Sequence, residues 1–156
     1  MKKIMTVFLA IATIFTLVGC GTSKNEVKDV PTKDLLEAVA AKVEVKLVPP
    51  FEGENIEEIY GLKASDYDEL EIRKSPINVQ ANEIIIVKAK EGKVDAVKKS
   101  LEDHGKAVEQ QWATYLPDQH EVTKARIINT MGNYAYLIID GNAKDLDTII
   151  KDKLKK

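Results

Sequence analysis

Residues 82–101, NEIIIVKAKEGKVDAVKKSL, decide the architecture expected of this chain. Four successive apolar residues starting at Ile84 are typical of a strand that is covered on both faces. A Glu-Gly turn follows. From Val94 onward, apolar residues recur every three or four positions, as they do in a helix lying on a sheet. The stretch therefore predicts a central strand at 82–89 and a long amphipathic helix that ends at Leu116-Pro117.

Toward the C-terminus, two more strands and a helix are expected. We interpret residues 122–129 and 134–140 as two alternating strands, and Met131-Gly132-Asn133 lies between them, which predicts a hairpin. A last helix is expected over 143–154, with an apolar stripe along one side. The sheet should therefore have about three strands.

Toward the N-terminus, the pattern predicts helices. One should begin at Pro31 with Thr32 as its N-cap, and Pro49-Pro50 should break it. A short helix is expected at 55–60, and a turn of helix at 65–69. Helices followed by strand–helix–strand–strand–helix indicate an α+β fold. We expect a small, mainly antiparallel sheet with amphipathic helices packed on it.

The composition excludes several classes of protein. The chain has 156 residues, 44% hydrophobic and 31% charged, with a formal charge of -2. These values are ordinary for a soluble globular domain. Without a basic stripe, a nucleic-acid partner is not expected. The single cysteine, Cys20, rules out an internal disulfide framework and a cysteine-based metal cluster.

Residues 1–19 have the pattern of a secretory signal. Lys2 and Lys3 precede an apolar run over 4–18, which is shorter than the roughly 20 residues of a membrane-spanning helix. We expect a signal peptide at 1–19, a polar tether at 20–31 and a single α+β domain at 32–156. Loss of the two lysines would leave 21 basic against 25 acidic residues, a balance of -4.

Leu17-Val18-Gly19-Cys20 resembles the lipobox of bacterial lipoproteins. The resemblance implies that the Cys20 thiol is alkylated with diacylglycerol and that a peptidase cleaves between Gly19 and Cys20. Two acyl chains make a stable anchor where one would be marginal. The expected location is the extracytoplasmic face of the cell membrane. The alternatives are a free thiol after an uncleaved signal anchor and a chance cysteine.

Two histidines are the main candidates for chemistry. His104 interrupts the apolar stripe of the long helix, so it is either a buried titrating group or, as we favour, a hydrogen-bonded core or boundary residue. His120 is expected in an exposed polar loop. It lacks the second histidine of an HExxH site. Gly105 lowers the helix propensity relative to alanine, and it either lets the helix approach another element closely or simply loosens the helix.

Other patterns give no catalytic, metal or cofactor site. The acidic residues of SDYDELE suggest calcium, but Leu70 occupies the third ligand position of an EF-hand, so a solvated surface is the better interpretation. The C-terminal lysines suit either anionic headgroups or a helix C-terminus. No P-loop, nucleophile elbow or dinucleotide fingerprint is present. We therefore assign no catalytic residue, no metal ligand and no cofactor.

Three motifs carry a resemblance to a known family: IIIVKAKEGKVDAVKKSLE, then ATYLP, then NYAYLIID. With these motifs the chain resembles small lipoproteins of Gram-positive Firmicutes that share a domain of unknown function, the domain-of-unknown-function 4358 family. The resemblance covers roughly 33–150. It implies a membrane-anchored α+β domain and carries over no active-site residue.

The leading hypothesis is a non-enzymatic lipoprotein that binds a protein or envelope partner at the outer face of the cytoplasmic membrane. Aromatic residues at the ends of elements can anchor partners. One alternative is an accessory lipoprotein that binds a small molecule or ion in a pocket between helix and sheet. Another is a hydrolase that uses one of the two histidines. The candidate binding surface consists of Tyr115, Leu116, Pro117, Tyr134 and Tyr136.

Overall fold

The computed structural model describes residues 27–156. The expected signal peptide and the cleavage position at Gly19 and Cys20 lie outside the described residues. The described part forms five helices and four strands, in the order α1 (Thr32–Ala40), α2 (Ile56–Tyr60), β1 (Tyr67–Lys74), β2 (Glu83–Ala89), α3 (Val94–Trp112), α4 (Pro117–Lys124), β3 (Ile127–Met131), β4 (Tyr134–Ile139) and α5 (Ala143–Leu154).

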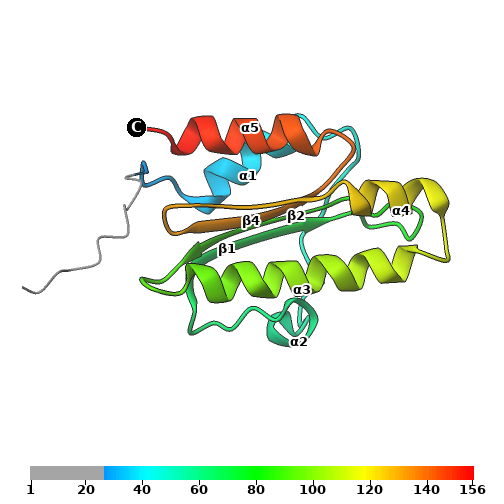
Figure 1. Cartoon of the computed structure of the whole chain (residues 1–156), viewed down its shortest axis with the longest axis horizontal. Coiled ribbons are helices and arrows are strands. Elements are labelled where there is room, and N and C mark those ends of the chain that lie inside the picture. Colours follow the sequence, from blue (N-terminus) through cyan, green and yellow to red (C-terminus); the bar gives the residue numbers. More distant parts are fainter. Residues whose placement is uncertain (1–26) are drawn as a thin grey trace, which may run out of the picture.

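The four strands form one antiparallel sheet in the order β1-β2-β4-β3. Helices α1 and α5 cover one face of the sheet, and α3 covers the other, with α2 and α4 beside it (Figure 1). The α+β class with an antiparallel sheet is confirmed, although the sheet has four strands where about three were expected. Among residues 27–156, no helix combines the length and apolarity needed to span a membrane.

Strand β2 lies in the middle of the sheet, as its apolar run predicts. Ile84 and Ile86 point to the face covered by α1 and α5, whereas Ile85 and Val87 point to the α3 face. All four side chains are fully buried. Alternation along the strand therefore supplies two separate cores from one run of four residues.

The expected turn of helix at 65–69 is wrong, because this region enters strand β1. Leu70 and Ile72 pack into the core on the α3 face, and Glu71 between them alternates to the other face. Pairing of β1 with β2 satisfies the backbone, so tertiary contacts override the local preference of a charge-rich segment. This strand is the one missing from the expected count.

The expected strand at 122–129 is wrong over its first half. Pro117 occupies the first turn of helix α4, where its missing N–H costs nothing and its φ is already helical. Helix α3 ends at Trp112, slightly earlier than expected, and β3 begins at Ile127. The hairpin between β3 and β4 and the helix at 143–154 are confirmed.

Helix α1 begins with the help of a distant carboxylate. Its N-cap is Pro31, not Thr32, and Thr32 is the first helical residue. Glu69 of β1 accepts hydrogen bonds from the Thr32 backbone N–H (2.8 Å) and hydroxyl (3.2 Å). The backbone bond, with further help from the Lys88 ammonium, holds the pKa of Glu69 below its usual range. The helix ends at Ala40, before the expected prolines.

The first described residues belong to the domain and not to a tether, which corrects the expectation for part of 20–31. Val27 forms an antiparallel bridge with Lys155, and the Lys28 N–H donates to the Leu154 carbonyl at 2.9 Å. Farther on, the Tyr134 hydroxyl accepts from the Val30 N–H and donates to its carbonyl. The chain thus enters the fold beside its own C-terminus.

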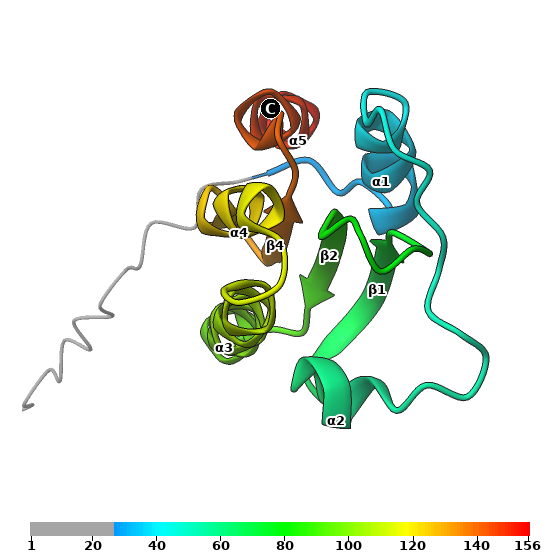
Figure 2. The ribbon, with the colours of Figure 1, turned by 90° about the vertical axis from the view of Figure 1, so that its right-hand side faces the viewer.

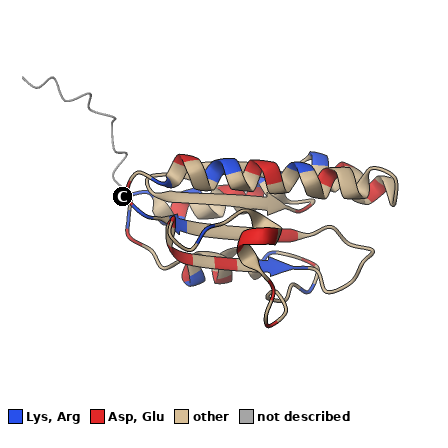
Figure 3. Cartoon of the chain, turned by 90° about the horizontal axis from the view of Figure 1, so that it is seen from below, with Lys and Arg blue, Asp and Glu red and all other residues tan. Residues whose placement is uncertain are grey.

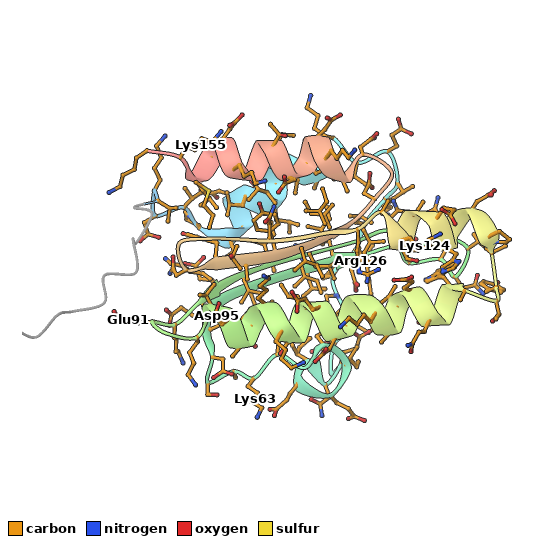
Figure 4. The ribbon with its side chains drawn as sticks, in the orientation of Figure 1. Lys63, Glu91, Asp95, Lys124, Arg126 and Lys155 are labelled. Atoms are coloured by element: carbon orange, nitrogen blue, oxygen red, sulfur yellow. The ribbon has the colours of Figure 1, made fainter. Side chains whose placement is uncertain are left out.

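This entry gives the sheet two distinct ends. The entry end contains residues 27–31, the C-terminus, the β3–β4 turn and the β2–α3 turn (Figure 1). The far end contains the β1–β2 loop at 75–82, the α3–α4 turn at 113–116, and helix α4. Figure 2 is seen from the far end, with α4 in front. In Figure 4, Lys124 and Arg126 lie toward the far end, and Glu91 and Lys155 toward the entry end.

Candidate functional site

Exposed apolar side chains lie at the far end. Ile77 and Val79 of the β1–β2 loop are 50% and 47% exposed, and Tyr115 of the α3–α4 turn is 52% exposed. The loop is joined to α4 by a hydrogen bond of 2.9 Å from the Ala81 N–H to Gln119 Oε1. This bond holds the β1–β2 loop against α4. We call the exposed residues Ile77, Val79 and Tyr115 at this end of the domain the far-end surface.

Contacts with the rest of the domain hold the two segments of the far-end surface in place. The β1–β2 loop is closed by the Ser75 N–H, which donates to the Asn82 carbonyl at 2.9 Å. The Tyr115 ring lies 5.6 Å from the ring of Trp112, which is buried in the core on the α3 face. The exposed apolar side chains of the far-end surface are therefore attached to backbone that these contacts hold in place, and not to a free chain end.

Two of the five residues expected on a binding surface lie elsewhere. Tyr134 and Tyr136 are fully buried in the core between the sheet and α1 and α5. Sequence alternation suggested that β4 had one open face, but α3 covers one side and α5 the other. Tyr115, Leu116 and Pro117 do lie together in the α3–α4 connection, at the surface or partly buried. The expected five-residue surface is therefore reduced to three.

The two buried tyrosines have structural partners. Tyr136 donates to Asp147 at 2.7 Å, and the same carboxylate accepts from Asn129 and Lys151. Burial, followed by the Asp147 hydrogen bond, raises the pKa of Tyr136. Burial alone would raise the pKa of Asp147, but its three hydrogen bonds and the Lys151 charge hold it below its usual range. The cluster fixes α5 on the sheet.

His104 is a hydrogen-bonded boundary residue, in keeping with the interpretation favoured from sequence. Its Nε2 atom lies 2.7 Å from Glu83 Oε2, and both side chains are 8% exposed. Its Nδ1 atom lies 3.2 Å from the backbone oxygen of Ile59 in α2. The histidine thus joins α3 to both β2 and α2. The sequence could have suggested Glu83 as the partner of His104. Side chains alternate along a strand, so Glu83 lies on the same face of β2 as Ile85, and α3 covers that face.

His120 lies in helix α4 and not in a loop, which corrects the expectation. Its Nε2 atom is 3.9 Å from Glu109 Oε1, and Glu109 is also bound by Arg126 at 2.6 Å. The Arg126 guanidinium holds the pKa of Glu109 below its usual range. The two histidines have separate carboxylate partners. In residues 27–156, neither imidazole ring is hydrogen-bonded to a serine, threonine or cysteine side chain; the Thr123 hydroxyl donates to the backbone oxygen of His120 at 2.7 Å.

The acidic residues near β1 are used in ion pairs and capping. Asp66 pairs with Lys93, Glu69 with Lys88, and Glu71 with Arg73. No group of three or more His, Cys, Asp or Glu within the described chain is arranged to hold a metal ion. Acidic and basic residues alternate along α3 (Figure 3). Lys98 pairs with Glu102 and Lys99 with Asp103, each one turn further along the helix.

One open pocket lies between the end of α1 and the edge of the sheet. Its volume is about 390 Å³, and its lining comes mainly from the segment after α1, including Val43, Val45 and Leu47. Three charged residues also line the pocket: Glu44, Lys46 and Arg73 of β1. Ala40, the last residue of α1, completes the lining. Arg73 is already bound to Glu71 and to the Ile72 carbonyl. One lining residue belongs to α1 and one to β1, so a small-molecule site between helix and sheet stays a prediction.

Fold and sites define a small α+β domain with covered sheet faces, a buried His–Glu pair and a partly apolar far end. The chain belongs to the family described as Domain of unknown function (DUF4358), whose model matches residues 41–140. No curated protein and no solved structure matches the chain. The matched span includes all four strands, both histidines and the far-end surface, but neither α1 nor α5.

Proposed function

We propose that this protein is a lipoprotein, anchored through Cys20 at the outer face of the cytoplasmic membrane, whose domain binds a protein partner without catalysis. The anchor is supported by the order of its first twenty residues: two lysines, an apolar run, and the lipobox-like Leu17-Val18-Gly19-Cys20. The binding role is supported by the far-end surface. Neither histidine is arranged with a nucleophile in the described chain.

The entry of the chain orients the domain in this proposal. Six residues separate Cys20 from Val27, and six extended residues span at most about 20 Å. Val27 is bound at the entry end, beside Lys155. A lipid on Cys20 therefore keeps the entry end next to the membrane. The far end then points away from the bilayer, toward other proteins of the cell envelope.

The exposed apolar groups at the far end are the observation that carries the binding role. Isolated apolar residues are common on surfaces, but Ile77, Val79 and Tyr115 project from two connected segments on a fixed base. Lipid is a poor occupant for this surface because the anchor lies at the opposite end. A protein that presents an apolar patch fits it, with the exposed tyrosine as the central contact.

The anchor is tested by metabolic labelling with palmitate. The wild-type chain should incorporate label and fractionate with membranes. Cys20→Ser should lose the label and accumulate as an unprocessed precursor. Label that persists in Cys20→Ser would refute anchoring at this residue and leave the binding role to be judged separately.

The binding surface is tested by site-specific photo-crosslinking in intact cells. A crosslinker at position 77 or 115 should give an adduct of one mass, whereas the same crosslinker at Lys153, near the entry end, should not. The protein in that adduct, once purified, should bind the full chain with a Kd that Val79→Ser raises at least tenfold. Equal adducts from both ends, or a Kd that Val79→Ser leaves unchanged, would refute this surface.

A small-molecule accessory lipoprotein is the second candidate function, and the pocket beside Arg73 is the observation in its favour. The pocket is open, and the only guanidinium lining it is already paired with Glu71. A ligand there would have to displace that pair. The pocket therefore supports this function less strongly than the far-end surface supports a protein partner.

A further inference from the structure

His104 faces an acceptor at each of its two ring nitrogens. Nε2 lies 2.7 Å from Glu83 Oε2, and Nδ1 lies 3.2 Å from the backbone oxygen of Ile59. A carbonyl oxygen can only accept a hydrogen bond, and an ionised carboxylate can only accept. The contact with Ile59 is therefore a hydrogen bond only if Nδ1 has a proton. The contact with Glu83 is one only if either Nε2 or the carboxyl group has a proton.

A count of protons follows from this geometry. A neutral imidazole has one N–H, and an ionised Glu83 has none, which leaves one contact with two facing lone pairs. Two protons satisfy both contacts, either as imidazolium with carboxylate or as neutral His104 with protonated Glu83. We infer that His104 and Glu83 form a proton-operated latch, which holds helix α2 on the domain while the pair carries two protons and loosens it when one is lost.

The surroundings of the pair make the second proton matter. Both side chains are 8% exposed, so the contact between Nε2 and Glu83 is shielded from water, whereas Ile59 is 45% exposed and its backbone oxygen lies at the surface. The Tyr60 ring of α2 lies 4.8 Å from the His104 ring, and the Tyr60 hydroxyl donates to Glu54 at 3.5 Å. Glu54 is in turn bound by Lys74 of β1 at 2.7 Å. Lys74 is thus already paired with Glu54, and His104 is the partner of Glu83.

Helix α2 is the element that this latch controls. It has five residues, too few to be stable alone, and Ile59 lies in its last turn. Apart from His104, a hydrogen bond of 2.8 Å from the Ser100 hydroxyl to the Gly61 carbonyl joins this region to α3. Release of α2 would expose Tyr60 and Leu62, which are 1% and 2% exposed in the closed form.

The direction of the pH effect follows from linkage. The closed form binds one proton more than a form in which α2 has moved away and the pair meets water. Opening therefore increases as pH rises. Loss of the hydrogen bond between His104 and the Ile59 oxygen is expected to increase the opening equilibrium by up to about tenfold.

Hydrogen exchange on the full-length chain in detergent micelles tests the latch. After correction for the intrinsic pH dependence of exchange, the amides of Ile59 and Gly61 should open about tenfold more at high pH than at about pH 5. The amide of Ile150 in α5 should show no such increase. Ring nitrogen NMR should find both nitrogens of His104 protonated, or a protonated Glu83 beside a neutral ring, in the closed form.

Glu83→Gln is the decisive variant. Its amide N–H₂ can donate to Nε2 of a neutral His104, while Nδ1–H donates to Ile59, so both contacts are satisfied without an extra proton. The α2 amides of this variant should stay protected, with opening independent of pH. His120→Gln is the matched control and should keep the wild-type pH dependence. The latch is overturned if Glu83→Gln keeps that dependence, or if a closed wild-type domain contains neutral His104 beside ionised Glu83.

Discussion

Gly105 of helix α3 lies directly against the side chain of Arg126. A Cβ on Gly105 would stand 2.8 Å from Arg126 Nε and 2.9 Å from its Cδ. Arg126 reaches across this position to donate to Glu109 at 2.6 Å and to the Thr123 carbonyl at 2.8 Å. The glycine therefore allows the close approach that sequence left open, and Arg126 joins α3 to the end of α4.

Gly105→Ala should destabilise the domain, although alanine is the better helix former. Helix propensity favours the change by about 1 kcal/mol. The new methyl group must displace Arg126 from two hydrogen bonds, which costs about 1–3 kcal/mol. We expect a net loss of about 1 kcal/mol in the free energy of unfolding, measured by urea denaturation.

The same change should have the opposite sign when Arg126 is absent. In an Arg126→Ala background the two closest atoms are gone, and the next nearest to the new Cβ is Ile128 Cδ1 at 3.5 Å, an ordinary contact. It should then stabilise the domain by about 1 kcal/mol. A double-mutant cycle without this reversal of sign would show that the close approach is not what keeps glycine at this position.

The parts of the fold that follow a local rule were predictable from sequence. Helices α3 and α5 each have one clear period and strand β2 has an uninterrupted apolar run, and their interiors are where these patterns place them. Strand β1 was missed because its charged residues are paired with distant partners, such as Lys88 for Glu69. No local pattern encodes such a partner.

The candidate site was harder to predict than the fold. The pairing of Glu83 with His104 depends on α3 crossing the first residue of β2, which is a tertiary fact. The burial of Tyr134 and Tyr136 depends on α5 covering a strand whose sequence looked half-exposed. Tyr115 is exposed, as the candidate surface required, and it lies in the turn that follows the last residue of α3.

Tyr136→Phe should lower the free energy of unfolding by about 1–2 kcal/mol. The change removes the hydroxyl that donates to Asp147 at 2.7 Å, and the buried carboxylate then keeps only Asn129 and Lys151. Thermal or urea denaturation measures the loss. Tyr115→Phe is the matched control, since its exposed ring should leave stability within about 0.5 kcal/mol. Equal effects of the two changes would contradict a role for the buried cluster.

Asp147 should contribute to the loss of stability in acid. Its pKa is held below the usual range in the folded domain, so the unfolded chain binds a proton at a higher pH than the folded one does. The stabilisation is therefore complete above the unfolded pKa of about 4 and is lost as pH falls through the folded value. Asp147→Asn should give a shallower fall in stability below about pH 4.

The control for this acid effect is Asp152→Asn on the same helix. The Asp152 side chain is 62% exposed and pairs only with Lys155, so its contribution is screened by solvent. The stability of this variant should fall with pH as steeply as that of the wild type. An Asp147→Asn profile parallel to the wild-type profile would place the acid sensitivity on other carboxylates.

Gly132→Ala should cost more than Gly92→Ala, although both glycines lie in tight turns with positive φ, of 60° and 75°. A Cβ on Gly92 meets nothing within 4 Å, so that change should cost only the backbone strain of about 1 kcal/mol. A Cβ on Gly132 would stand 2.5 Å from Val27 Cγ2, where the chain enters the domain. The added clash should raise the cost to about 2–3 kcal/mol. In a Val27→Ala background the two costs should become equal. A difference that persists there would mean that the β3–β4 turn does not hold the entering chain through this contact.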